Sequence, residues 1–364
     1  MKRKCRWGIL GAASIARKNW QAVRDAGNAE LVAVASRDMR RARKFVRECQ
    51  AAAAHAVLPS AMGSYEALLA RSDIDAVYLP LPTVLRKEWV LKAAAAGKHV
   101  LAEKPAGSSA DDVKEMLDAC EKHGVQFMDG VMFMHGRRLQ RLRRVVDQEI
   151  GQVRHVATQF SFLGGPEFLR SDIRTQGRLE PLGCLGDLGW YCLRFTLWAM
   201  GEKPPLSVIG RMHSEVAQGG GVPSVPTEFS GILSFAEGVS ASFHCSFTAA
   251  NAQWARVSGS EGLLDVSDFV LPFSGQRTRY GLTRSEFVVK GCRFEMKERH
   301  RVKTLRESAN NAPGSQEANM FQAFSKQVLS GKCDPAWPQS TLLTQRVLDA
   351  CLRSARQGSR VISL

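Results

Sequence analysis

The sequence predicts an α/β protein of two domains: an N-terminal parallel sheet covered by helices, then a C-terminal α/β domain built on an open, largely antiparallel sheet. The chain has 364 residues, more than one hydrophobic core usually supports. Its first third alternates short apolar runs with helical patterns, which is typical of a parallel sheet with helices on both faces. After residue 150, longer β-type runs follow one another with Gly-Ser or Glu-Gly turns between several of them, which favours antiparallel strands.

Five strands and five helices are predicted in the first domain. Gly97 and Gly124 stand where two of the helices should end, and Ser109 with Asp112 resembles an N-terminal cap with an acidic partner. The predicted strands are 6–10, 31–36, 76–81, 99–102 and 125–128, and the predicted helices are 15–25, 39–49, 65–70, 87–96 and 110–123. The alanines 51–54 are expected to form a helix end or a loop.

The boundary is expected near residues 129–136, which gives domains of 1–130 and 131–364. The second domain begins with a helical pattern, because Leu139, Leu142, Val145 and Val146 recur at helical spacing. Its predicted strands are 153–162, 228–235, 239–247 and 256–266. Residues 320–357 return to a helical pattern and are expected to pack back on the larger body.

The composition is that of a globular protein, with 45% hydrophobic and 23% charged residues and a net charge of +15. The positive charge is concentrated in residues 37–47 and 137–144. Such runs attract phosphate backbones, so a nucleic-acid partner is an alternative. However, the second run overlaps the helical apolar stripe and is explained by a helix with one packed and one solvated face. A nucleic-acid partner is therefore not expected.

No apolar run reaches the ~18 to 20 residues needed to span a bilayer, and the first strand follows the N-terminal basic residues without a signal-peptide core. We therefore expect a cytoplasmic protein with no membrane partner. The nine cysteines are scattered and never spaced as Cys-x-x-Cys, so neither a disulfide framework nor a metal site is indicated.

A strand running into a small-residue turn opens the chain. In a dinucleotide-binding fingerprint the first glycine makes the turn, the second lets pyrophosphate approach and the third lets helix meet strand. Here Gly11, Ala13 and Ala16 occupy those positions, and the alanine in the middle makes the match imperfect. An ordinary strand-turn-helix is the alternative. The candidate cofactor-binding residues in this segment are Gly11, Ala12, Ala13, Ser14, Ile15 and Ala16.

The end of the second predicted strand indicates which cofactor binds. An NAD site usually places Asp or Glu there, whereas the 2′-phosphate of NADP needs cations and hydroxyl donors. This chain has Ser36 and Arg37 at that point and Arg41 shortly after, while Asp38 follows the tip. We therefore predict NADP(H) over NAD(H), which remains the alternative. If the arginines only form a solvated turn, they carry no such preference.

A buried strand ending in Glu103-Lys104-Pro105 places one amine beside the expected cofactor. Lys104 is therefore the first candidate for a catalytic residue. The alternative is a surface lysine at the end of a strand.

These segments resemble the glucose-fructose oxidoreductase, inositol dehydrogenase and rhizopine-catabolism (Gfo/Idh/MocA) family over nearly the whole chain. Within it, the chain looks closest to plant-type uncharacterised and dihydrodiol-dehydrogenase-like branches. The Glu-Lys-Pro block and its spacing from an Asp-x-Gly-x-Tyr helix are the most specific parts. The segments that carry the resemblance are 7–16, 75–83, 97–105, 172–174 and 186–191.

The resemblance implies a Rossmann domain, an α/β domain whose open sheet often forms the interface of a homo-oligomer, and an active site between the two. Carried over by motif, the catalytic candidates are Lys104, Asp187 and Tyr191. Relatives often have histidine where Tyr191 and Arg86 stand, and an acidic residue where Arg194 stands. The resemblance also places Leu81, Pro82, Thr83, Glu103 and Lys104 at the cofactor.

Hydride transfer to or from an alcohol needs an acid or base for the hydroxyl proton. A free tyrosine has a pKa of about 10, and an ammonium ~5 Å away stabilises its anion by roughly 3 kcal/mol at an effective dielectric of ~20, or about two pKa units. Lys104 can thus lower the pKa of Tyr191 so that its hydroxyl can act as the acid or base. Asp187, four residues earlier on the same helical face, would oppose that ionisation, so we expect it to orient Lys104 or to accept from a substrate hydroxyl.

The sequence therefore predicts an NADP-dependent oxidoreductase that acts on a small molecule: a sugar, a polyol or a cyclic diol, or the matching carbonyl. A trans-dihydrodiol dehydrogenase is the nearest alternative among enzymes. A protein of another class, a catalytically silent NADP-binding sensor, would keep the fold and the cofactor without turnover. The three catalytic candidates also have structural explanations: a surface lysine, an aspartate at a helix start and a tyrosine in an aromatic core.

Overall fold

The computed structural model describes residues 3–217 and 219–364. Backbone contacts divide the chain into two compact units. The first comprises residues 1–135, 176–181 and 310–346, and the second comprises 136–175, 182–309 and 347–364. The predicted boundary after residue 130 assigned the segments 176–181 and 310–346 to the second domain.

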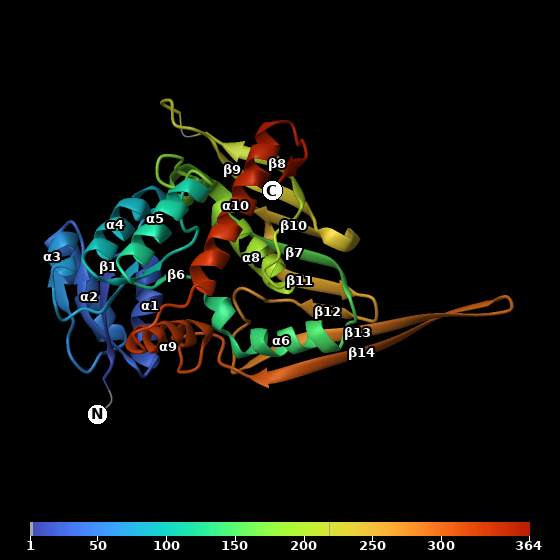
Figure 1. The fold of residues 1–364 in the computed structure, drawn as a ribbon, viewed down its shortest axis with the longest axis horizontal. Coiled ribbons are helices and arrows are strands. Elements are labelled where there is room, and N and C mark those ends of the chain that lie inside the picture. Colours follow the sequence, from blue (N-terminus) through green and yellow to red (C-terminus); the bar gives the residue numbers. More distant parts are fainter. Residues whose placement is uncertain (1–2, 218) are drawn as a thin grey trace. The chain divides into compact units, whose positions relative to one another are not determined.

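The sheet of the first unit has six strands in the order β3-β2-β1-β4-β5-β6. Strands β1 and β6 of this sheet are labelled in Figure 1. All neighbouring strands are parallel, as predicted. Five strands match the predicted ones within a few residues, and β3 is a short edge strand that the sequence did not indicate. The strands are β1 (Cys5–Leu10), β2 (Ala29–Ala35), β3 (Ser60–Met62), β4 (Ala76–Leu79), β5 (His99–Ala102) and β6 (Phe127–Asp129).

Several helices of this unit begin or end at capping residues. The Ser109 hydroxyl accepts a hydrogen bond from the Asp112 amide at 3.2 Å, which confirms the predicted cap. Gly97 and Gly124 end two helices with φ of +70° and +64°, also as predicted. The helices are α1 (Ser14–Asp25), α2 (Met39–Ala52), α3 (Tyr65–Leu69), α4 (Thr83–Ala95), α5 (Ala110–Lys122) and η1 (Met132–His135). Helix α4 starts four residues before its predicted start.

Helix α9 (Gln316–Leu329) comes from near the end of the chain and packs on α1 and β1. The Trp7 ring lies 4.9 Å from the Phe321 ring and 5.2 Å from the Phe324 ring, centroid to centroid. The Trp7 indole nitrogen donates to the Ser325 hydroxyl at 2.9 Å, so the one polar atom of this buried side chain has a partner. The late helix therefore covers one face of the strand that leads to the glycine turn.

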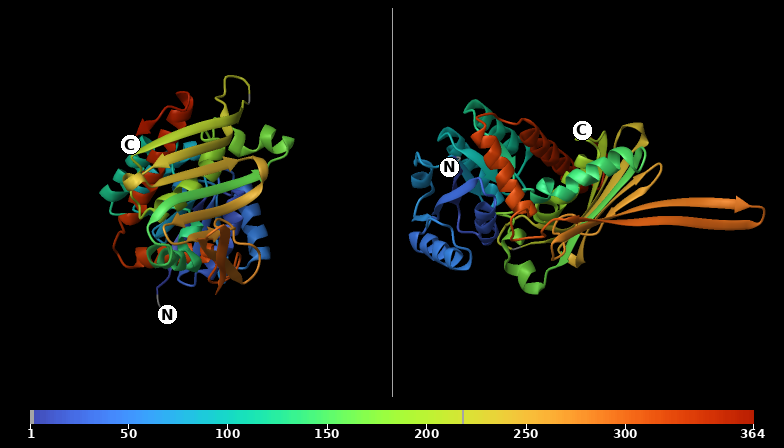
Figure 2. Two further views of the ribbon diagram at one scale, coloured as in Figure 1. Left: turned by 90° about the vertical axis from the view of Figure 1, so that its right-hand side faces the viewer. Right: turned by 90° about the horizontal axis from the view of Figure 1, so that it is seen from below.

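The second unit is built on a nine-stranded sheet in the order β14-β13-β12-β11-β7-β10-β9-β8-β15, seen face-on in Figure 2, left. Strands β7 and β10 are parallel and the other pairs are antiparallel, which gives the predicted largely antiparallel sheet. The strands are β7 (Val153–Leu163), β8 (Ser207–Val216), β9 (Val225–Ser234), β10 (Ser240–Ser246), β11 (Thr248–Gly259), β12 (Leu263–Val266), β13 (Arg277–Lys290), β14 (Arg293–Arg306) and β15 (Ile362–Ser363).

The prediction of one strand over 256–266 is wrong. Two strands, β11 and β12, are joined there by a turn in which the Gly259 amide donates to the Gly262 carbonyl at 2.8 Å. A Cβ at Gly259 would lie 2.0 Å from the Ile150 carbonyl oxygen, so the close approach of that backbone requires glycine. The β-type residues on both sides of the turn concealed it in the sequence.

One face of this sheet is buried and the other is open. The buried face carries an apolar row with one residue from each of seven strands: Val208, Leu233, Ala241, Val156, Val257, Leu264 and Leu282. Helix α8 (Trp190–Ala199) packs on β7, β10 and β11. Helix α6 (Arg137–Gln148) buries the four apolar residues predicted for it. The remaining elements are α7 (Pro166–Ser171), η2 (Ile173–Thr175), η3 (Leu185–Gly189), η4 (Ala236–Gly238) and α10 (Ala336–Arg356).

Strands β13 and β14 are fourteen residues each and extend well beyond the rest of their sheet (Figures 1 and 2). We call residues 284–299, the distal part of this hairpin, the arm. Within the described residues, no helix is long and apolar enough to cross a membrane.

Candidate active site

The predicted cofactor residues lie at one edge of the six-stranded sheet. Gly11 to Ala16 follow β1, Ser36 and Arg37 follow β2, Leu81 to Thr83 follow β4, and Glu103 and Lys104 follow β5. Since all these strands are parallel, their carboxyl ends share an edge. The chain order reverses between β1 and β4, and ligands of open α/β sheets bind at such a switch point. The structure thus brings these residues together.

Gly11 makes the turn between β1 and α1 with a φ of +127°, a backbone angle that residues with a side chain rarely adopt. A Cβ at this position would lie 3.1 Å from the Leu81 Cδ2 atom. The first turn of α1 follows at once, and no side chain caps its N-terminal amides. An open helix end after a tight glycine turn fits a pyrophosphate. Ala13, the N-cap residue, takes the place of the middle glycine.

The tip after β2 carries the residues that would choose between NADP and NAD. Ser36 is buried, and Arg37 and Arg41 are exposed. The Asp38 carboxylate accepts from the Arg40 amide at 2.8 Å and so caps α2. One Arg41 nitrogen donates to the Ala12 carbonyl at 3.4 Å, which ties α2 to the glycine turn. The tip thus carries one hydroxyl and two arginines, while the Asp38 carboxylate is engaged as a cap.

A buried hydrogen-bond chain lies beneath Lys104. The Asn19 amide donates to the Tyr78 hydroxyl at 2.6 Å, and Tyr78 donates to the Glu103 carboxylate at 2.6 Å. The other Glu103 oxygen accepts from the Lys104 amide at 3.3 Å. Burial and the Glu103 charge hold the pKa of Tyr78 well above its ordinary value, so its hydroxyl remains a donor. The chain fixes the backbone at Lys104, whose side chain is half-buried.

Arg86 joins two of the turns at this edge. Its guanidinium donates to the Leu81 carbonyl at 2.9 Å, to the Thr83 hydroxyl at 3.1 Å and to the Pro105 carbonyl. The side chain is 4% exposed, so these bonds form out of contact with bulk water. Arg86 thus positions the backbone of both turns beside the candidate site.

Glu180 is a residue of this edge that the sequence did not indicate. Its carboxylate accepts from the Thr83 amide at 3.0 Å and from the Thr83 hydroxyl. The N-cap position of α4 is Pro82, which has no side-chain acceptor, so Glu180 caps the helix from a distance in sequence. A single glutamate in an irregular loop offers no pattern from which this role could have been found.

Asp187 and Tyr191 belong to the second unit. Asp187 lies in a π-helical turn, η3, and Tyr191 is the second residue of α8. The two residues are four positions apart, and the segment that joins them passes from this π-helical turn directly into an α-helix. Single π turns of this kind are frequent at functional sites. Tyr191 is 7% exposed, and its ring meets the Phe160 ring edge-on at 5.6 Å.

Asp187 has a charged partner in its own unit. Its Oδ2 atom lies 3.2 Å from the Arg174 Nε atom, and Arg174 also pairs with Asp172 at 3.3 Å. An arginine beside Asp187 offsets the negative charge that would otherwise oppose ionisation of a nearby phenol. Arg174 appeared in the sequence only as part of the resemblance, so this contact is new information about the site.

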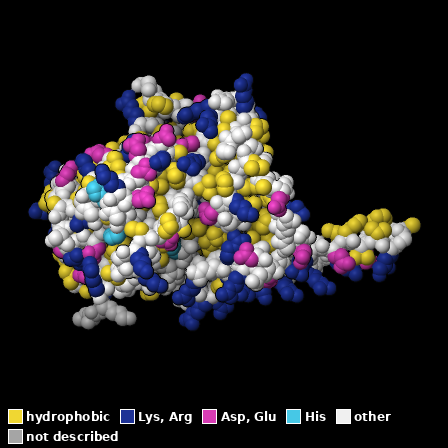
Figure 3. Space-filling model, viewed as in Figure 1, with side chains coloured by type: hydrophobic (Ala, Val, Ile, Leu, Met, Phe, Trp, Pro, Cys, Tyr) yellow, Lys and Arg dark blue, Asp and Glu magenta, His cyan; other side chains and the backbone are white. Residues whose placement is uncertain are grey.

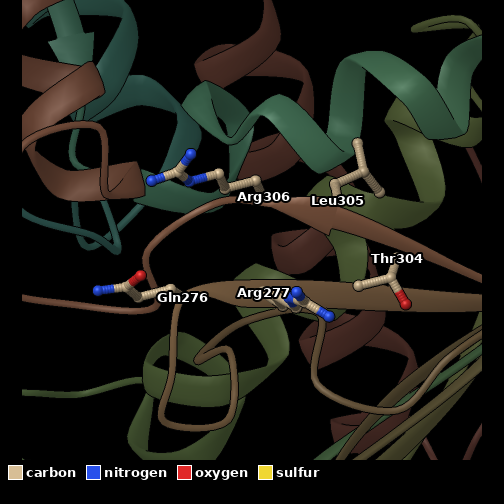
Figure 4. A pocket seen from close by; sticks show the side chains of 5 residues that line it. All are labelled: Gln276, Arg277, Thr304, Leu305 and Arg306. Atoms are coloured by element: carbon tan, nitrogen blue, oxygen red, sulfur yellow. The ribbon is translucent and has the colours of Figure 1, made fainter.

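The second unit also has a hollow of about 500 Å³ at the base of β13 and β14 (Figure 4). Its lining is polar and partly basic, and Arg277 and Arg306 are direct cross-strand partners. Guanidinium groups donate hydrogen bonds and accept none, so they offer no base for an alcohol. No predicted site residue lines this hollow, which is formed by Gln276, Arg277, Thr304, Leu305 and Arg306.

Two family models match the chain. Residues 5–131 match the model described as the oxidoreductase family with an NAD-binding Rossmann fold, GFO_IDH_MocA. Residues 139–265 match the model of the GFO/IDH/MocA C-terminal domain. The two matches cover both the strands that carry the cofactor edge and the segment that carries Asp187 and Tyr191.

Similar proteins include curated enzymes and solved structures. D-xylose 1-dehydrogenase (NADP(+)) 2 of Haloferax volcanii is 30% identical, with 98% of each chain covered. Trans-1,2-dihydrobenzene-1,2-diol dehydrogenase of Bos taurus is 32% identical over 72% of this chain and 74% of its own. A mutant of a 3-ketoreductase from Actinomadura kijaniata, solved with TDP-benzene and NADP, matches with a TM-score of 0.78 at 26% identity, with 98% of each chain covered.

Proposed function

Because the chain belongs to the Gfo/Idh/MocA oxidoreductase family, and is an NAD(P)-dependent dehydrogenase or reductase of CH–OH or carbonyl groups, we propose that it uses NADP(H) on a sugar, a polyol or a cyclic diol. The side chains at the β2 tip support the choice of NADP(H) in this proposal. Arg37 and Arg41 supply cations for a 2′-phosphate and Ser36 supplies a hydroxyl, while Asp38 is engaged as the cap of α2.

The remaining cofactor contacts come from the same edge. The glycine turn and the open first turn of α1 receive the pyrophosphate, and the segments 81–83 and 103–104 hold the nicotinamide end. When bound, the cofactor supplies the hydride acceptor or donor. The protein supplies position and proton transfer, and the Tyr78–Glu103 chain under Lys104 keeps the lysine backbone in place.

Tyr191 is the acid or base in this proposal. Its hydroxyl takes the proton of the substrate alcohol in oxidation and returns one to the carbonyl oxygen in reduction. The Lys104 ammonium stabilises the phenolate, so the proposal requires both groups to meet at one substrate oxygen. Arg174 neutralises Asp187, which leaves the carboxylate able to accept from a substrate hydroxyl without opposing the phenolate.

The relatives define the substrate panel. One is named for D-xylose, one for a trans-dihydrodiol, and another, from Streptomyces violaceoruber, is a dTDP-3,4-didehydro-2,6-dideoxy-alpha-D-glucose 3-reductase. NADP⁺ reduction would be followed by absorbance with aldoses, polyols and trans-dihydrodiols, and NADPH oxidation with the matching carbonyls, with NAD(H) as the comparison. Tight NADP(H) binding with no turnover across the panel would favour an untested substrate or a catalytically silent sensor.

The residue test is Tyr191→Phe, measured on the best substrate of the panel. We expect kcat to fall by about 10²- to 10⁴-fold, the usual contribution of a general acid or base, with NADP(H) affinity within twofold of wild type. Tyr280→Phe, at a buried tyrosine of β13 in the same unit, is the matched control and should keep full activity. A Tyr191→Phe enzyme with wild-type kcat would overturn the assignment.

A second variant tests whether Lys104 stabilises the Tyr191 phenolate or has only a structural role. With Lys104→Met the phenolate loses its cation, so the pH at which kcat rises in the oxidation direction should move up by as much as about two pH units. A lower kcat with an unshifted profile would contradict the proposed role of the lysine.

A further inference from the structure

The arm has one exposed apolar face. In the antiparallel register, Phe287 stands opposite Met296 and Val289 stands opposite Phe294, so all four side chains project from the same side of the hairpin. Their exposed fractions are 60, 70, 51 and 67% respectively. Figure 3 shows this apolar surface as a continuous strip along one edge of the projecting hairpin.

The opposite face of the arm is charged. It carries Arg284, Glu286, Lys290, Arg293, Glu295, Lys297 and Arg299, with Val288 as its one aliphatic side chain. The two faces therefore differ as sharply as the two faces of a half-buried sheet. In this hairpin, however, both faces are largely exposed, the apolar one included.

The polarity of the two faces reverses along β13. Near the sheet, Tyr280 and Leu282 are buried on the core side, and the outer side is occupied by Gly281 and Thr283. Beyond the polar outer pair Ser285 and Glu298, the outer positions are apolar, and the core-side positions of the arm are charged except Val288. The pairing of β13 with β14 continues without a bulge from Arg277 to Lys290, so no slip in register produces the reversal. The apolar strip thus lies on the side of the hairpin that continues the open face of the nine-stranded sheet.

An isolated two-stranded hairpin is only marginally stable in water, and a contiguous exposed apolar patch marks an interaction site. We propose that the arm docks on a second copy of this chain, with each arm laying its apolar face on the body of the other copy. Phe287, Val289, Phe294 and Met296 form the centre of the contact. Val302, 58% exposed, lies on the same face nearer the sheet, beyond Glu298 and His300.

The area favours reciprocal exchange over other arrangements. Five side chains that are half to two-thirds exposed offer roughly 500 Å² on each arm, taking 150–250 Å² for a whole aromatic side chain. Two arms that each cover an equal area of the partner's body bury roughly 2,000 Å² in total, at the upper end of the range for stable interfaces. One arm docked alone, or two arms packed only on each other, bury about half of that, near the lower limit.

The first test is the monomer–dimer equilibrium of the full-length protein, measured by sedimentation. A matched pair of variants isolates the apolar face: Val289→Ser lies on it, and Val288→Ser lies on the charged face one residue away. We expect Val289→Ser to raise the dimer Kd about tenfold or more, and Phe287→Ser/Phe294→Ser to raise it at least ~100-fold. Val288→Ser should leave it within about twofold. A wild-type monomer at micromolar concentration, or equal effects of the matched pair, would overturn the proposal.

The second test uses the natural thiol at the tip of the arm. Cys292 is exposed in the turn between β13 and β14, and Cys333→Ser removes the other exposed thiol of the described residues. A benzophenone maleimide on Cys292 would be photolysed in a mixture of isotope-labelled and unlabelled chains. Cross-links from the tip to residues outside 277–306 of the other chain support reciprocal docking. Cross-links confined to one chain, or to the arm of the other, contradict it.

Discussion

Replacing Gly11 by alanine tests whether the β1–α1 turn has the conformation on which the cofactor site depends. Its φ of +127° costs a side chain about 1–3 kcal/mol of backbone strain. The added methyl would also lie 3.1 Å from Leu81 Cδ2, and such crowding adds roughly 1 kcal/mol. We therefore expect the free energy of unfolding of Gly11→Ala to fall by about 2–4 kcal/mol.

The strain also falls on the segment that is to receive the pyrophosphate. If the turn relaxes by moving its backbone, the amides at the start of α1 move with it, and the Kd for NADP(H) should rise at least ~10-fold. Urea denaturation gives the change in stability. Calorimetric titration of the folded variant with NADP⁺ gives the change in affinity.

Gly97→Ala is the matched control. Gly97 also has a positive φ, +70°, but a Cβ there would meet nothing within 4 Å. This variant should lose only about 1 kcal/mol, the ordinary cost of a left-handed alanine, and should bind NADP⁺ like wild type. Adding Leu81→Ala to Gly11→Ala isolates the crowding, since the glycine substitution should cost ~1 kcal/mol less in that background. Wild-type NADP⁺ affinity in Gly11→Ala would refute the assignment of this turn to the cofactor.

Three further predictions concern the groups around the site. Tyr78→Phe leaves the buried Glu103 carboxylate without its donor and should cost about 1–3 kcal/mol in urea denaturation; an unchanged midpoint would contradict the buried chain. Glu180→Gln removes the negative charge at the start of α4 and should cost about 1 kcal/mol, whereas the exposed Glu121→Gln should cost nothing, and equal effects would exclude the capping role. Burial lowers the pKa of His99, whose neutral Nδ1 atom accepts from the Gln126 amide at 2.9 Å, so its contribution is complete above the unfolded pKa of ~6.5 and is lost as pH falls through the folded value. His99→Asn should therefore flatten the pH dependence of stability below pH 6.5 by up to about 1.4 kcal/mol per unit relative to His123→Asn, and parallel curves would disprove this.

The first sheet could be predicted because its signals are local. Apolar runs of four to seven residues, glycines at helix ends and the Ser109 cap each act within one element, and a parallel order follows from their alternation with helices. β3 lacked such a signal, since its three residues, Ser60–Met62, between Pro59 and Gly63, are too few to show a period. The prediction of one strand over 256–266 was wrong for the opposite reason. β-type residues continue there across a turn that only the packing of Gly259 against Ile150 reveals.

Some residues of the candidate site could likewise be located from local sequence patterns, and others could not. Gly11, Lys104 and the β2 tip stand at fixed offsets from strands, so a sequence pattern can locate them. Glu180 and Arg174 act at a distance from any motif: the carboxylate caps a helix that begins 97 residues earlier in the chain, and the guanidinium pairs with Asp187 from an irregular loop. Such partners depend on three-dimensional proximity alone. The π turn at η3, which carries Asp187, likewise has no cue in the residues.

The arm shows what periodicity can and cannot establish. Alternation along 284–299 would have indicated a strand pair with one apolar face, because Phe287, Val289, Phe294 and Met296 occupy every second position. Periodicity fixes which side chains share a face, but it does not say what covers that face. In β12 the covered face meets the core of its own unit. In the arm, the faces have exchanged polarity relative to the core, so the same alternation directs the apolar side chains away from the chain's own core. After Leu282, the apolar residues of β13 therefore change from the core-facing positions to the outward-facing ones. We infer that this change in the sequence marks a surface for a second molecule.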